Sequence, residues 1–220
     1  RLYILAGNHQ DSLASSQRLI SLDPKLSVAH VLAGSTLMVN ADLELAKASF
    51  EKEISLDQKD PIAWLSLGLI KLISGNYSGA IDDFEHAGAN TGFNRAARGV
   101  SHAYLLSGEI HQASKVLSKF DKTKNAIGYL SDAAVAISNG QVDKASEAYK
   151  KAGEIFIDFK MPGFDIREYS TNTNFETAKL LSFSNDLYRQ GYFLLTIELL
   201  EKNKNLLNDS AFLSLTRARA

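Results

Sequence analysis

Histidines are the side chains of this sequence best suited to acid–base or metal chemistry, so their spacing is considered first. There are five of them, spread along the chain, and none belongs to an HExxH motif or to another paired spacing that holds a metal ion. The sequence also lacks a GxSxG nucleophile motif, a phosphate-binding P-loop and a glycine-rich dinucleotide motif. These absences predict that the chain is not an enzyme and that it has no catalytic residue, no metal and no cofactor.

Arg95, Arg98 and His102 form a basic stripe, because spacings of i, i+3 and i+7 place side chains on one face of a helix. Two arginines near a helix N-terminus oppose the helix dipole unless an acidic group compensates. Two interpretations are open. Either the stripe pairs with Asp82 or Asp83, which are otherwise typical of a solvated helix face, or it anchors an anionic group of a bound peptide.

Composition excludes several classes of function. The chain has 220 residues, 45% of them hydrophobic and 22% charged, which is typical of globular protein. The net charge of −1 gives no basic field for nucleic acid, so no nucleic-acid partner is expected. No apolar run is long enough to span a bilayer, and no basic-then-apolar leader opens the chain. Cysteine is absent, which removes disulfides and thiolate sites.

The elements that must position these side chains are clearest in residues 61–94. Two antiparallel helices approach closely only where a small side chain on one faces a large side chain on the other. Gly68 and Ala80 supply the small positions, and Trp64, Leu67 and Phe84 supply the large ones. A single helix pair of this kind cannot bury its faces alone, so neighbouring pairs must stack.

This stretch resembles a tetratricopeptide repeat, a helix–turn–helix unit with a period of about 34 residues. The residues that carry the resemblance are Trp64, Leu67, Gly68, Gly75, Tyr77, Ala80, Phe84 and Ala87. The resemblance implies an all-α fold, a right-handed superhelical solenoid of antiparallel helix pairs.

The same rhythm continues in both directions from this repeat. We expect one solenoid over residues 1–220, cut from a longer array because both ends fall inside a unit. Its parts are a partial repeat 1–26, repeats 27–60, 61–94, 94–125 and 126–159, an irregular insertion 160–176, a repeat 177–210 and a partial repeat 211–220.

In tetratricopeptide arrays the first helices of the repeats line a concave groove, and the resemblance places Val28 and Ile62 at its start. The partner-binding residues it implies are Val31, Met38, Leu65, Leu69, Leu72, Arg95, Arg98, His102, Leu130, Asn185 and Tyr188. Such a groove is mostly apolar. It either receives a peptide or an amphipathic helix of a partner, or it is filled by the packing of the array itself.

The insertion 160–176 breaks the period with Pro162, Gly163 and a polar run, which predicts loop or extended chain. Phe164 and Tyr169 are aromatic residues within it. They either cover the seam between two imperfectly stacked units or belong to a docking loop.

The sequence therefore predicts a non-catalytic scaffold that binds another polypeptide, in an assembly, export or envelope-associated complex. The alternative is an arm that presents substrates to an enzyme domain outside this segment, and self-association is a third option. The lack of cysteine and the style of the array favour a bacterial protein of the periplasm or cytoplasm, with a lean towards the cell envelope.

Overall fold

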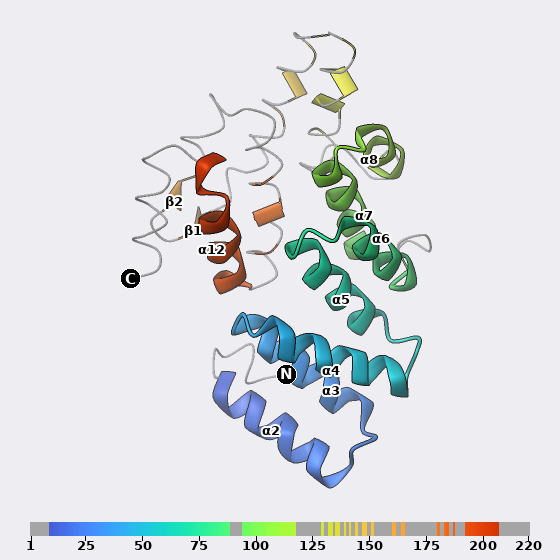
Figure 1. Cartoon of the computed structure of the whole chain (residues 1–220), viewed down its shortest axis with the longest axis vertical. Helices are drawn as coiled ribbons and strands as arrows, with labels where there is room; N and C mark the ends of the chain where they lie inside the picture. The colour runs from blue at the N-terminus through green and yellow to red at the C-terminus, as the bar shows by residue number, and fades with distance from the viewer. Residues whose placement is uncertain are drawn as a thin grey trace. The chain divides into compact units, whose positions relative to one another are not determined.

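The computed structural model of the chain is shown in Figure 1. It divides into two compact units, Arg1–Gly99 and Val100–Ala220, with the boundary inside a helix. The sequence had predicted one continuous solenoid. The residues that the structure describes are 9–88, 94–117 and 192–206, with 129, 132–133, 135–136, 139, 141, 144, 147–148, 151, 160–161, 164–165, 180, 183–184 and 187.

Helices follow one another in antiparallel pairs along the first unit, as Figure 1 shows. In the part of the chain that the structure describes, this unit contains α2 (His9–Leu22), α3 (Ser27–Val39), α4 (Leu43–Leu56), α5 (Pro61–Ile73) and α6 (Tyr77–His86), and the unit boundary lies within α7 (Asn94–Ser107). The described helices of the second unit include α8 (Ile110–Leu117) and α12 (Phe193–Lys202). A short 3-10 helix, Lys204–Leu206, follows α12. The predicted all-α class of antiparallel helix pairs is confirmed.

The pairs α3–α4 and α5–α6 are held by the small-to-large contacts that the sequence predicts. A Cβ placed on Gly34 of α3 would lie 2.8 Å from the ring of Phe50 on α4. One repeat later, a Cβ on Gly68 of α5 would lie 2.6 Å from the ring of Phe84 on α6. Both rings are fully buried. Glycine is required at both places because only hydrogen leaves room for the ring.

Phe84 makes a second contact of this kind, with the next repeat. A Cβ on Gly99 of α7 would lie 2.6 Å from the Phe84 ring. The ring therefore lies between two glycines, Gly68 within its own pair and Gly99 on the following helix. The sequence analysis had assigned no role to Gly99.

The turns between paired helices share one hydrogen-bond pattern, in which an amide just after the first helix reaches back across its last turn. Asn76 N donates to Lys71 O at 2.9 Å, and Gly75 before it has φ 81°. Ala41 occupies the same place in the preceding turn with φ 63°. Equivalent bonds run from Asp42 to Leu37, Glu109 to Tyr104, Gln141 to Ala136 and Tyr192 to Leu187.

The start of α5 is capped by an acidic side chain, whereas Asp42 at the start of α4 makes no side-chain capping bond. Asp60 accepts hydrogen bonds from the backbone nitrogens of Ile62 and Ala63, each at 2.7 Å, and Pro61 opens α5. Helix α3 begins at Ser27, and Leu26 stands at its cap position without a side-chain capping bond. The Ser27 hydroxyl donates to the carboxylate of Glu53, a fully buried side chain of α4.

Within the predicted insertion, two short strands are described. β1 (Lys160–Met161) and β2 (Phe164–Asp165) pair antiparallel, with Lys160 opposite Asp165 and Met161 opposite Phe164. The extended chain predicted there is thus confirmed at these four residues. The rest of the insertion, residues 1–8 and the partial repeat 211–220 lie outside the described residues.

Candidate partner-binding surface

The predicted groove residues on α3 and α5 are mostly buried. Met38 is fully buried, and Leu65, Leu69 and Leu72 are 3%, 4% and 2% exposed, while Val31 is half-buried. The start of the predicted groove is different, since Val28 is 54% exposed and Ile62 is 40% exposed. The apolar surface that these two helices offer is therefore concentrated in their first turns.

Side-chain exposure also decreases along the basic stripe on α7, from its first residue to its last. Arg95 is exposed, Arg98 is half-buried and His102 is 2% exposed. The His102 ring contacts the ring of Phe183, with centroids 5.2 Å apart and planes tilted by 52°. His102 is thus part of the packing of the second unit, and Arg95 is the member of the stripe that faces solvent most.

Val28, Ile62 and Arg95 share one position: each is the second residue of its helix, in α3, α5 and α7. They come from three consecutive repeats and all belong to the first unit. We call these three residues the first-turn strip. The resemblance to tetratricopeptide repeats implied that they line the groove, and their exposure distinguishes them from the buried positions further along the same helices.

Several predicted site residues cannot be placed. Leu130, Asn185, Tyr188 and Tyr169 lie outside the described residues, and for Phe164 the backbone is described as part of β2 but the side chain is not.

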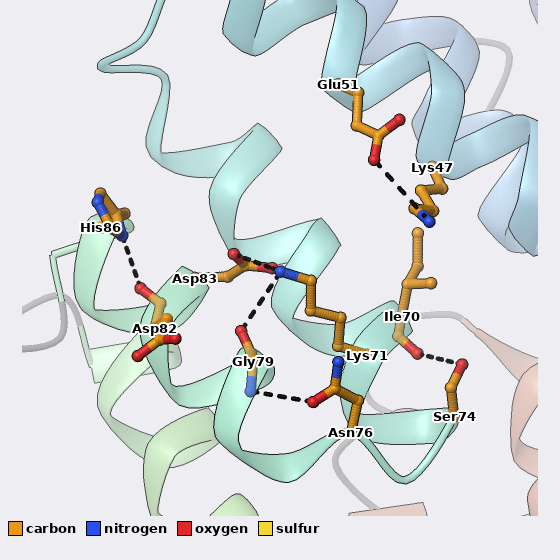
Figure 2. A network of polar contacts seen from close by, with 10 residues as sticks. All are labelled: Lys47, Glu51, Ile70, Lys71, Ser74, Asn76, Gly79, Asp82, Asp83 and His86. Carbon is orange, nitrogen blue, oxygen red and sulfur yellow. Dashed lines mark hydrogen bonds and ion pairs between the residues drawn. The ribbon is translucent and has the colours of Figure 1, made fainter.

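An ion pair that is buried at its Asp83 end joins α5 to α6, and the sequence did not predict it (Figure 2). Lys71 Nζ lies 2.7 Å from Asp83 Oδ2 and donates to Asp83 Oδ1 at 2.8 Å. Asp83 is 3% exposed, so its predicted place on a solvated face is wrong. Burial raises the pKa of the Asp83 carboxyl, and the Lys71 ammonium opposes this shift only in part. Lys71 stands in the last turn of α5, and Asp83 lies 12 residues later, on α6.

An aromatic stack lies on the same helix pair. The ring of Trp64 on α5 stacks on His86 at the end of α6, with centroids 4.5 Å apart and planes 22° from parallel. Each ring is also tied to backbone: Trp64 Nε1 donates to Gln58 O at 2.8 Å, and His86 Nδ1 lies 2.8 Å from Asp82 O. Figure 2 shows the second of these contacts. The stack and the ion pair together close the space between α5 and α6.

The second unit has a hollow of about 310 Å³ on the repeat 126–159. It is lined by Tyr129, Asp132, Val135, Ala136, Gln141, Lys144, Glu147, Ala148 and Lys151. Lys151 Nζ and Glu147 Oε1 are 2.7 Å apart on its rim. The Lys151 ammonium lowers the pKa of Glu147, which is exposed.

Among the described residues, no group of three or more histidine, cysteine, aspartate or glutamate side chains is placed to hold a metal ion. The described helices also include none that is both long and apolar enough to cross a membrane.

Comparisons with known proteins agree with this architecture, although no family model matches the sequence. Anaphase-promoting complex subunit 3 of Schizosaccharomyces pombe is 32% identical over 85 residues, which are 39% of this chain and 13% of that protein. The cell division cycle protein 27 homolog of Caenorhabditis elegans is 33% identical over 70 residues, 32% of this chain and 9% of that protein. The match thus spans only a small part of these relatives.

Two solved structures share the fold over nearly the whole chain. PilF of Pseudomonas aeruginosa has a TM-score of 0.61 at 14% identity and covers 99% of this chain and 91% of its own. PilW, a type IV pilus biogenesis factor, has a TM-score of 0.60 at 15% identity and covers 97% and 93%. These relatives and structures are tetratricopeptide-repeat proteins. Together with the glycine–phenylalanine contacts and the shared turns, they show that this chain has the fold of tetratricopeptide-repeat proteins, in which antiparallel helix pairs follow one another.

Proposed function

We propose that the chain is a non-catalytic scaffold that binds a peptide or amphipathic helix of a partner protein. The observation that carries this proposal is the first-turn strip, in which Val28, Ile62 and Arg95 are exposed at equivalent places in three consecutive repeats. A contiguous exposed apolar surface is the usual mark of a contact with another protein, and exposed side chains at the same place in successive repeats can build such a surface. Helix pairs that interlock as tightly as these give the strip a rigid support.

The strip also indicates what kind of segment it binds. Two apolar side chains followed by an arginine fit a segment with apolar residues at one end and an acidic residue at the other. An amphipathic helix or a short extended peptide supplies this pattern. The buried positions Leu65, Leu69 and Leu72 would serve to hold α5 in place and not to touch the partner.

The complex in which this scaffold acts is proposed from the comparisons. PilW is a type IV pilus biogenesis factor, and the curated relatives include a subunit of the anaphase-promoting complex. Both are named for roles in assemblies of several proteins. We propose an assembly, export or envelope-associated complex, of bacterial origin, for the present chain.

The test compares two exposed apolar residues of the first unit, one within the first-turn strip and one outside it. Ile62→Glu places a charge in the first-turn strip, whereas Leu45→Glu is a matched control on α4, where the leucine is 62% exposed. We expect affinity capture, read by mass spectrometry, to lose a partner with Ile62→Glu and to keep it with Leu45→Glu. Equal recovery by both variants would remove the strip from the proposal.

A second variant tests the basic end of the strip. Replacing Arg95 and Arg98 by alanine should weaken the affinity for the captured partner about 5- to 30-fold, because an anchoring hydrogen bond to a charged group contributes about 1–2 kcal/mol when it is partly exposed. Isothermal titration with the captured partner measures this change. Unchanged affinity would show that the arginines serve only the packing of α7.

A further inference from the structure

The hollow on the repeat 126–159 is lined by residues whose equivalents in the repeat 61–94 contact one another across the α5–α6 pair. The shared turn fixes the comparison, because Asn76 N bonds to Lys71 O and Gln141 N bonds to Ala136 O in the same way. Ala136 therefore stands where Lys71 stands. At the same distance past the turn, Ala148 stands where Asp83 stands. The Lys71–Asp83 pair is thus replaced by two methyl groups.

The residues that correspond to the Trp64–His86 stack differ as well. Tyr129 stands at the position of Trp64, and Lys151 stands at the position of His86. In the α5–α6 pair the two rings stack at 4.5 Å. Tyr129 is half-buried and makes no ring contact within the described part of the chain. The hollow is therefore a place where both an ion pair and an aromatic partner are missing.

The lining indicates the kind of group that fits. Its floor is apolar, with Val135, Ala136 and Ala148. Its charged members are two acids, Asp132 and Glu147, and two lysines, Lys144 and Lys151, so the lining has no net charge and favours an uncharged occupant. Its volume of about 310 Å³ is at the lower end of the range of small-ligand pockets, roughly 300–1,000 Å³.

We propose that this hollow receives an aromatic side chain of a partner polypeptide. The ring would stack on Tyr129, where the equivalent repeat has its own stack, and would lie over the two alanines. The exposed ammonium of Lys144 at the rim adds a cation–π contact. This inference rests on the proposed scaffold function and adds an aromatic anchor point to it, in the second unit of the chain.

The first experiment uses a small neutral probe on the ¹⁵N-labelled full chain. N-acetyl-tryptophanamide should shift the amide signals of Tyr129, Ala136 and Ala148, and N-acetyl-leucinamide should bind about 5-fold more weakly because it lacks the ring. Absence of shifts at these residues, or equal binding of the two probes, would overturn the proposal.

The second experiment closes the hollow by rebuilding the contact of the other repeat. Ala136→Lys combined with Ala148→Asp should weaken N-acetyl-tryptophanamide at least about 10-fold, since the side chains fill the floor. Should this variant fail to fold, as judged by circular dichroism, Ala148→Leu fills the same floor with an apolar group and must give the same loss. Retained probe binding in a folded variant would overturn the proposal.

The same variant separates this inference from the scaffold function. With the captured partner, Ala136→Lys/Ala148→Asp should reduce affinity about 5-fold, while the first-turn strip stays intact. A partner that still depends on Ile62 but binds this variant as tightly as the unchanged chain would overturn the aromatic anchor and leave the scaffold role standing.

Discussion

At the scale of single residues, glycine decides how closely the helices approach. Gly68 and Gly99 both face the ring of Phe84, and Gly34 faces Phe50. The sequence predicts the small residue in the first helix of a repeat because the same repeat carries a large residue at a fixed distance in its second helix. The role of Gly99 could not, because it depends on where the next helix passes over the ring.

The first prediction concerns Gly68. Gly68→Leu should lower the free energy of unfolding by about 1–3 kcal/mol, because even a Cβ would lie 2.6 Å from the Phe84 ring. Urea denaturation measures this loss. Adding Phe84→Ala to Gly68→Leu should recover part of it, and an unchanged midpoint for the single variant would contradict the packing described here.

The second prediction concerns the turn before α4. Ala41 has φ 63°, a left-handed conformation that costs an L-residue about 1 kcal/mol, while Gly75 has φ 81° at the equivalent place with no atom near its missing Cβ. Ala41→Gly should therefore stabilise the protein by about 0.5–1 kcal/mol, and Gly75→Ala should destabilise it by a similar amount. Thermal unfolding of both variants tests this, and changes of the same sign would contradict it.

At the scale of elements, α5 and α6 are joined by polar contacts as well as by their apolar core. The Lys71–Asp83 pair lies between the helices, and Asn76 caps α6 by accepting from Gly79 N at 3.1 Å (Figure 2). The ion pair at Lys47 and Glu51 is exposed, at 3.9 Å, and contributes little. A buried pair of this kind is better evidence for the alignment of two helices than for their stability.

The third prediction is the pH dependence of this pair. Because burial raises the pKa of Asp83, the stability that its protonation contributes is present at low pH and is lost as the pH rises through the folded-state pKa. In Asp83→Asn this group no longer titrates. The stability of the unchanged chain relative to the variant should therefore fall as the pH rises above about 4, the ordinary pKa of an aspartate.

Urea midpoints of the two proteins at each pH measure this difference. Other groups, such as Glu147 with its lowered pKa, titrate in both proteins and cancel in the comparison. A relative stability that rises with pH would mean that the Lys71 ammonium outweighs burial.

At the scale of the whole molecule, the repeats are coupled through contacts between neighbours. Ser12 Oγ on α2 lies 2.9 Å from Thr36 Oγ1 on α3, which joins one repeat to the next by a buried hydrogen bond. Gly99 and Phe84 join α7 to α6 by close packing. Arrays of this type owe their cooperativity to such interfaces between repeats, in addition to the stability of each repeat.

The fourth prediction separates these two contributions. Gly99→Leu crowds the Phe84 ring from α7 of the next repeat, whereas Gly68→Leu crowds the same ring from α5 of its own helix pair. Gly99→Leu should lower stability by about 1–3 kcal/mol and also broaden the urea transition, because neighbouring repeats then unfold less cooperatively. Gly68→Leu is the matched comparison, and equal transition slopes for the two variants would contradict this assignment.

By itself, the sequence determined the repeat, its period and the residues that pair within a helix hairpin. Gly68 with Phe84 and the Asp60–Pro61 start of α5 follow from local rules of size and capping, which act over one or two turns of helix.

Only the tertiary structure decided which side chains remain exposed. Val28 and Leu65 both have apolar side chains and both were predicted to line the groove, yet one is 54% exposed and the other 3%. Likewise, Asp82 and Asp83 are adjacent identical residues, and only Asp83 is buried against Lys71. Exposure and pairing depend on neighbours that are far apart in sequence, so composition and spacing cannot give them.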